Sequence, residues 1–383
     1  MGVSSNELSR ASLRQTLALD TSFSSKLQSN LSRIFSIAVI ALSFLIVAYF
    51  LFWQFDDKPA ILEFQPSTLL VKNEAGNLLW KKEIGTEPIT FLSQPIIKKT
   101  KSRIVDLKND GRKEIVTVHE LDRGDSLGGL SVFDENGNQL WYSVFSDSVQ
   151  TKVEKFSSSF TIRSIVDIYN NDEILVIAQH YRYYPSPFIR ISSDGKIISG
   201  DFWHPGGSMG GFLEDIDDDG KIELVASAIS NGLERCVIFS IEYDKLIGTA
   251  PTSENYSFLG MQIADFDHYV VLPRTDYNRY FDYRYNTVYP PYINEKKRIG
   301  VSLDEDRKSI YLGQAPLVVF NKDFSNPEVV IADDFRSLRD SIVVAGKLNP
   351  PLTDTPEYAK ILEDQIRYWN GEEFVTHDEY FKK

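Results

Sequence analysis

The sequence is poor in the residues on which several kinds of site depend. It has one cysteine, Cys236, so no disulfide forms within the chain, and this thiol stands in an apolar run where a small buried side chain is expected. The five histidines show none of the spacings typical of zinc sites, and no phosphate-binding glycine loop occurs. The net charge of −13, without a basic stripe, argues against a nucleic-acid partner.

One long apolar run stands near the N-terminus. Residues 34–53 carry no charged side chain over 20 positions, which is enough for a helix that crosses a hydrocarbon core of about 30 Å. A cleaved signal peptide is the alternative, but it would have a shorter apolar core and small residues at its cleavage site. Basic residues precede the run and Asp56 and Asp57 follow it. We therefore expect a single-pass anchor in the cytoplasmic (inner) membrane, with residues 1–33 as a short cytoplasmic tail and residues 54–383 outside.

The remainder of the chain contains repeats. Three segments share an apolar lead-in, an acidic turn and an apolar strand, and two weaker copies follow. They are 103–120, 163–180 and 211–228, with the weaker copies at 260–273 and 329–346. A segment that recurs at intervals of roughly 50–60 residues indicates one structural unit that is used several times.

A second element lies between these copies and predicts hairpins. It is a strand, a turn with glycine and another strand, found at 69–85, 130–145, 188–203 and 366–380. Two hairpins in each period of roughly 50–60 residues make a four-stranded sheet, which is the blade of a β-propeller. We therefore expect an all-β domain of about six blades, in a range of about five to seven, after one transmembrane helix. A pair of two-sheet sandwiches is the alternative.

The acidic turns resemble a known repeat. The segments DIDDDGKIELV and DLKNDGRKEIV, with VFDENGNQLW about 20 residues after the acidic turn, are similar to the FG-GAP/VCBS repeats of integrin-type β-propellers. The resemblance covers about residues 100–346. It implies an extracellular protein that binds calcium in its acidic loops and serves in adhesion, ligand binding or scaffolding.

The turn that begins at Asp215 has the spacing of an oxygen-ligand cation site. Asp215, Asp217 and Asp219 occupy alternate positions, Gly220 allows a sharp bend, and Glu223 can complete the set. A divalent cation would relieve the repulsion among these carboxylates. The alternative is a solvated turn without metal. We expect structural calcium here.

A related turn is a weaker candidate for the same ion. Asp106, Asp110 and Glu114 match three of the positions in the 103–120 copy, but Lys108 stands where the second ligand is needed. An ammonium group at that position removes a ligand and partly neutralises the turn.

A tyrosine-rich insertion near 275–300 interrupts the repeats. Its tyrosines alternate with arginine and include Tyr280, Tyr283, Tyr285 and Tyr289. Exposed tyrosine makes good recognition surface for a protein or glycan ligand. Packing against blade edges is the alternative.

These patterns together predict a function outside the membrane. We expect a non-catalytic binding or scaffolding module with structural calcium, not an enzyme, that meets a protein or glycan ligand. The alternatives are a polysaccharide-active enzyme on a propeller and a ligand sensor that signals through the helix.

Overall fold

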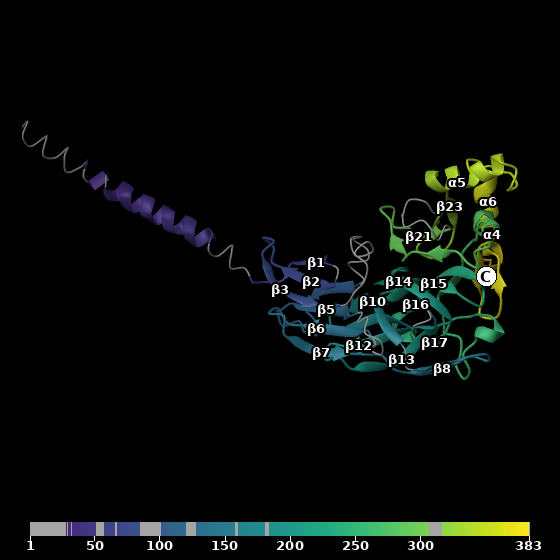
Figure 1. The fold of residues 1–383 in the computed structure, drawn as a ribbon, viewed down its shortest axis with the longest axis horizontal. Helices are drawn as coiled ribbons and strands as arrows, with labels where there is room; N and C mark the ends of the chain where they lie inside the picture. The colour runs from purple at the N-terminus through teal and green to yellow at the C-terminus, as the bar shows by residue number, and fades with distance from the viewer. Residues whose placement is uncertain are drawn as a thin grey trace, which may run out of the picture. The chain divides into compact units, whose positions relative to one another are not determined.

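The computed structural model places most of the chain (Figure 1). It describes residues 28, 30–31, 33–50, 57–65, 67–84, 101–119, 128–157, 160–180, 184–305 and 316–382. Two compact units make up the chain. They are Met1–Lys58 with Asn73–Asn77, and Pro59–Lys72 with Leu78–Lys383.

The first unit contains an apolar helix, Arg33–Phe50, whose 18 residues are not buried. The hydroxyl of Ser43 donates to the carbonyl oxygen of Val39 at 2.8 Å, so it returns its hydrogen bond to the helix itself. By length and composition the helix can cross a membrane, and a signal sequence near the N-terminus would meet the same criterion. Most of the expected cytoplasmic tail and residues 51–53 of the expected span lie outside the described residues.

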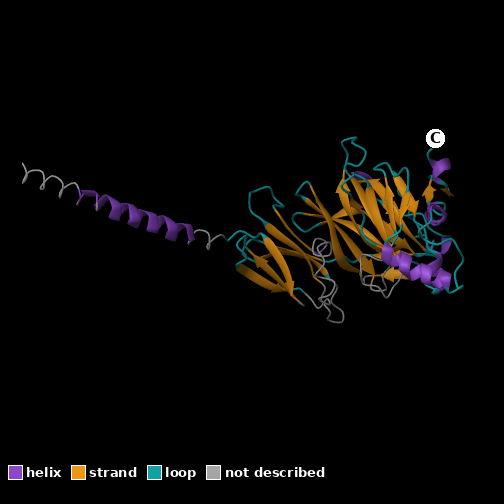
Figure 2. Ribbon diagram, turned by 90° about the horizontal axis from the view of Figure 1, so that it is seen from above, coloured by secondary structure: helices purple, strands orange, loops and turns teal. Residues whose placement is uncertain are grey.

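The second unit consists mainly of β-strands, coloured orange in Figure 2. The first sheet contains β1 (Ile61–Gln65), β2 (Thr68–Lys72) and β3 (Leu78–Glu83). The second contains β4 (Ser102–Val105), β5 (Glu114–His119), β6 (Gly129–Phe133) and β7 (Gln139–Ser143). A separate two-stranded ribbon follows, made of β8 (Ser148–Gln150) and β9 (Lys155–Ser157).

Three further sheets complete the strands. The third contains β10 (Phe160–Tyr169), β11 (Glu173–His180), β12 (Ser186–Ser192), β13 (Ile197–His204) and β17 (Gly248–Thr249). The fourth contains β14 (Gly206–Glu214), β15 (Glu223–Ser230), β16 (Arg235–Glu242), β18 (His268–Val271), β24 (Arg367–Trp369) and β25 (Phe374–Val375). The fifth contains β19 (Thr287–Val288), β20 (Tyr292–Ile293), β21 (Ile299–Asp304), β22 (Leu317–Phe320) and β23 (Glu328–Val330).

Short helices belong to the later part of the unit. They are the 3₁₀ turns Tyr243–Lys245 and Glu254–Tyr256 and the α-helices α4 (Asp276–Tyr280), α5 (Asp333–Val344), α6 (Pro356–Glu363) and α7 (His377–Tyr380). An ion pair between buried Arg339 and half-buried Asp276, with a hydrogen bond from Tyr358, joins three of them. Arg339 of α5 donates to both carboxylate oxygens of Asp276 in α4, at 3.0 and 2.8 Å. Tyr358 of α6 donates to the same carboxylate at 3.0 Å, and the guanidinium group lies 4.0 Å from its ring centroid.

Hydrophobic cores lie between successive sheets, and the central strands supply residues to two cores at once. In β11, Val176 packs toward the second sheet and Ile177 toward the fourth. In β15, Leu224 packs toward the third sheet and Val225 toward the fifth. Neighbouring residues of a strand point to opposite faces. This explains why β15 is buried at every position, as expected of a strand that is covered on both faces.

The prediction of a mainly β domain after one apolar helix is confirmed as to the type of secondary structure. One of the weak repeat copies is wrong, because the segment 329–346 contains helix α5 where a second strand was expected. Phe335, Leu338 and Ile342 follow a helical spacing and pack on the core between the fourth and fifth sheets. The acidic residues at 333 and 334 stand in the first turn, where they interact favourably with the helix dipole.

Replacing Phe239 by alanine should lower the free energy of unfolding by about 3–5 kcal/mol. Its fully buried ring lies between the third and fourth sheets, with centroids 5.9 Å from Phe188 and 5.5 Å from Phe202. Urea unfolding of the full chain in detergent, followed by tryptophan fluorescence, measures the change. The control is Phe281→Ala, whose side chain is 43% exposed and should cost less than about 1 kcal/mol. Equal losses in the two variants would contradict a core between these sheets.

Acid should destabilise the second unit through His204. This imidazole is fully buried beside the hydroxyl of Tyr269, at 3.2 Å, and burial lowers its pKa to about 3. The unfolded chain binds the proton near pH 6.5, so the stability is complete above that pH and is lost as the pH falls toward 3. Urea midpoints from pH 7.5 to 4.5 should fall less steeply in His204→Phe than in the natural chain. Parallel curves would rule out this residue as a source of acid sensitivity.

Candidate metal centre

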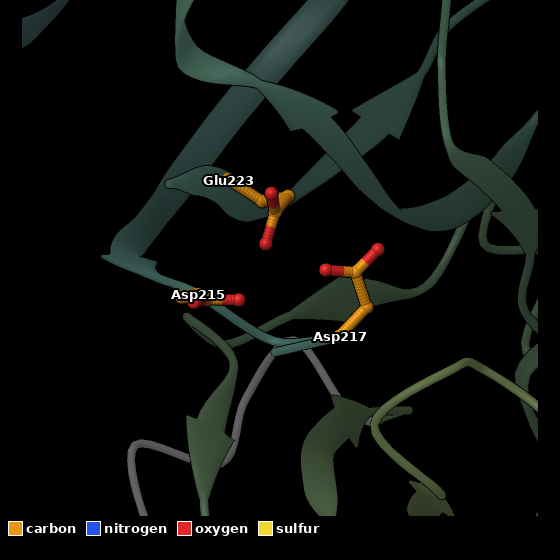
Figure 3. Close-up of side chains that lie close together, drawn as sticks. All are labelled: Asp215, Asp217 and Glu223. Carbon is orange, nitrogen blue, oxygen red and sulfur yellow. The ribbon is translucent and has the colours of Figure 1, made fainter. Parts of the chain in front are cut away.

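The turn between β14 and β15 brings three carboxylates together. Asp215 and Asp217 belong to the turn, and Glu223 is the first residue of β15. One oxygen from each lies within 4.8 Å of the others. Figure 3 shows the three side chains pointing toward one another. Three carboxyl groups are therefore gathered around one point.

Backbone amides hold these carboxylates in place. The N–H of Gly220 donates to Asp215 at 3.0 Å, and the N–H of Ile216 donates to Glu223 at 2.8 Å. Gly220 has a φ of +86°, a conformation that glycine adopts without strain, and it bends the chain sharply. The turn is thus ordered by its own hydrogen bonds, and each of these carboxylates keeps capacity to accept more.

One oxygen of Asp215 has no partner. Its Oδ1 is buried and accepts no hydrogen bond from the described part of the chain. A buried polar atom left in this state costs about 1–3 kcal/mol, and more when it is charged. A cation at the centre of the three side chains would supply the missing interaction.

The electrostatic environment opposes full ionisation of the group. Burial is the main cause that raises the pKa of Glu223 to about 7, and the carboxylates of Asp217 and Asp267 raise it further. Burial likewise raises the pKa of Asp267 to about 6. Asp267 precedes β18, on the far side of β16 from β15, and its buried Oδ2 also lacks a partner among the described residues. A bound cation would counter both the burial and the repulsion.

The spacing along the chain does not determine which aspartates join the group, as Asp219 and Asp267 show. Asp219 accepts from the backbone N–H of Lys221 at 2.8 Å and lies 3.3 Å from its ammonium group, so it is engaged at the surface. It is not one of the three convergent carboxylates. Asp267 lies 44 positions after Glu223, and only sheet pairing brings it near the turn.

The turn between β4 and β5 has the same pattern of backbone hydrogen bonds, but it lacks a carboxylate at the position of Asp217. Glu114 accepts from the N–H of Leu107 at 2.9 Å, and Asp106 accepts from Asp110 and Gly111 at 3.1 and 2.9 Å. Both oxygens of Asp106 are therefore occupied. Lys108 stands where the other turn has Asp217. This turn is ordered by its own hydrogen bonds, and a metal ion at Asp106, Asp110 and Glu114 stays a prediction.

The four tyrosines of the insertion do not form one cluster. Tyr280 is exposed, whereas Tyr283 and Tyr289 are half-buried. Tyr285 packs against the core between the fourth and fifth sheets. Burial of part of the group fits the packing alternative, and Tyr280 is left as the exposed member.

Comparisons with known proteins find distant structural likeness only. No family model matches the sequence, and no curated protein matches it. A variant of Synechocystis apocarotenoid oxygenase is 11% identical, with a TM-score of 0.27, over 72% of this chain and 68% of that one. The lignostilbene dioxygenase of Pseudomonas brassicacearum is 10% identical, with a TM-score of 0.27, over 73% and 61%. The cobalt-substituted Synechocystis enzyme is 11% identical, with a TM-score of 0.25, over 72% and 66%. These values assign neither activity to this chain.

The comparisons correct the resemblance to FG-GAP/VCBS repeats. The similar structures named above are oxygenases, and no family model supports the repeat assignment. The predictions of a non-catalytic binding or scaffolding module, of no enzyme activity and of structural calcium are overturned with it, and so is the polysaccharide-active alternative. The physical reason lies in the motif itself. An aspartate at the start of a tight turn accepts backbone N–H groups from the end of the turn, as Asp106 does from Asp110 and Gly111, whatever the family.

Proposed function

We propose that this protein is a membrane-anchored β-sheet protein that binds a divalent cation at the turn between β14 and β15. The observation that carries the proposal is the convergence of Asp215, Asp217 and Glu223 on one point. The unpartnered Oδ1 of Asp215 supports it. Carboxylate oxygens suit hard cations such as Mg²⁺ and Mn²⁺.

The chain's own residues have distinct roles in this proposal. Glu223 enters from a buried strand and provides a rigid ligand, whereas Asp215 and Asp217 come from the turn. Asp267 adds negative charge without belonging to the group of three. A bound cation would neutralise these groups and could polarise a further oxygen ligand from water or a substrate.

Mn²⁺ binding to the full chain in detergent tests the site. We expect a saturable isotherm by titration calorimetry, weakened more than about tenfold in Asp217→Asn because one charged ligand is lost. The matched control is Asp110→Asn in the turn between β4 and β5, which should bind as the natural chain does. With EDTA present, Asp217→Asn should be at least as stable as the natural chain, since the change removes repulsion. Equal Mn²⁺ affinity in the natural chain and Asp217→Asn would refute the site.

The propeller remains a proposal for the arrangement of the sheets. It is supported by the mainly antiparallel pairing within the sheets, with β13 and β17 the parallel exception, and by the cores between successive sheets. The described residues form five such sheets, and the expectation from the repeats is about six blades.

The proposed location is the cytoplasmic membrane, with the N-terminus inside and the β-domain outside. The apolar helix and the basic residues before it support this orientation. We include in the proposal a protein or glycan ligand on the outer side, contacted through the exposed Tyr280.

The single buried cysteine makes the orientation easy to test. Cys236 is fully buried, so the natural chain should not react with a membrane-impermeant maleimide in intact cells. Lys296→Cys places a thiol at an exposed position of the β-domain and should be labelled in intact cells. Ser5→Cys, in the expected tail, should be labelled only after permeabilisation. Labelling in the opposite order would overturn the orientation.

A further inference from the structure

Two arginines leave the fourth sheet side by side, although they are far apart in the sequence. Strand β16 begins at Arg235 and pairs antiparallel with β18. The pairing extends to Leu272, whose N–H donates to the carbonyl oxygen of Cys236 at 2.8 Å. Arg235 is next to Cys236, and Arg274 follows Leu272 after Pro273, so both arginines lie at the same end of the sheet.

Gln365, which follows helix α6, holds a third arginine, Arg279, close to Arg274. The side-chain oxygen of Gln365 accepts from the backbone N–H of Arg274 at 3.4 Å. The same oxygen accepts from the guanidinium group of Arg279, in helix α4, at 3.1 Å. One acceptor therefore ties Arg279 to the chain at Arg274, beside Arg235.

The charge of these arginines is not neutralised by ion pairs. Among the described residues the three guanidinium groups form none, and the nearby Glu234 is paired with Arg284 at 2.9 Å. The side chain of Arg235 makes no hydrogen bond within the described part of the chain. Burial lowers the pKa of Arg235, and the positive charges of Arg279 and Arg274 lower it further. Positive charge is thus concentrated here in a chain of net charge −13.

A buried carboxyl group behind the arginines balances them only in part. Glu305 accepts hydrogen bonds from the hydroxyl of Thr275 at 2.6 Å and from the amide of Asn286 at 2.7 Å. Burial raises its pKa to about 7, so near neutral pH it carries less than a full negative charge. The outward side of the arginines can therefore accept an anion from solvent.

We infer that Arg235, Arg274 and Arg279 form a binding site for the phosphate or sulfate group of a ligand. A guanidinium fork matches the oxygens of such a group, and several cations favour an anion with more than one negative charge. Arg274 is held by Asn278, with 2.6 Å between Nε and Oδ1, whereas Arg279 is exposed and open to a ligand. Tyr280 and Phe281 follow in the chain and are 42% and 43% exposed. They provide an aromatic rim for the organic part of a ligand.

This site lies at the opposite end of the fourth sheet from the carboxylates. Glu223 pairs with Glu242 at one end of β15 and β16, and Ser230 pairs with Arg235 at the other. The two sites are separated by the length of these strands, about 23 Å at 3.3 Å per residue. Anion binding can therefore be tested independently of the proposed cation.

Titration of the full chain in detergent with inorganic phosphate, in EDTA and low salt, tests the inference. We expect saturable binding that weakens as NaCl is added. Arg235→Gln and Arg279→Gln should each weaken it about tenfold, as loss of a charge-assisted hydrogen bond implies. Arg112→Gln is the matched control, because this arginine is exposed in the turn between β4 and β5, and the variant should bind phosphate as the natural chain does.

The same titration identifies the source of the anion. Phenyl phosphate binding more tightly than inorganic phosphate would indicate an organic ester that uses the aromatic rim, and equal binding would indicate a free anion. Melting temperatures without phosphate show that each variant is folded. Absence of saturable binding of either probe in the millimolar range would overturn the inference. Unchanged affinity in a folded Arg235→Gln would overturn it equally.

Discussion

The burial of the central strands on both faces is the constraint on which the rest of this structure depends. Each of β5, β11 and β15 lies between two cores, so its side chains are mostly apolar on both faces, with small polar exceptions such as Thr117 and Ser227. The charged residues of the two inferred sites lie at the ends of the strands, as Glu223 and Arg235 do. Both sites inferred here lie at ends of the fourth sheet, where the chain enters or leaves a covered strand.

The same constraint explains the electrostatics of the carboxylates. Glu223 begins β15, and the packing of Leu224 and Val225 on opposite sides draws it out of water. Burial then raises its pKa and makes a nearby cation favourable. Glu114 begins β5 in the same way, but Lys108 takes the place of a ligand there. The two turns differ at one ligand position, where the candidate metal centre has Asp217 and the other turn has Lys108.

The misassigned repeat family shows how a short motif can arise from local physics. The first aspartate of each turn, Asp106 or Asp215, accepts the backbone N–H of the glycine five residues later. Any hairpin with a tight acidic turn gains from this arrangement. The motif therefore predicts a hairpin correctly, but it does not indicate the protein family or a calcium site.

The sequence by itself determined the local features: the apolar helix, the mainly β character, the turns that need a positive φ, and Asp215, Asp217 and Glu223 as candidate ligands. These depend on neighbours within a few residues, where spacing and backbone preference are decisive. Only the tertiary structure decided that Asp267 comes near the carboxylates, because the pairing of β16 with β18 brings it there. It alone placed helix α5 where a strand was expected, and gathered Arg235 with Arg274 and Arg279. The positions of Asp267 and of the arginines depend on contacts between segments 30 or more residues apart, and a linear pattern carries no record of which segments will meet.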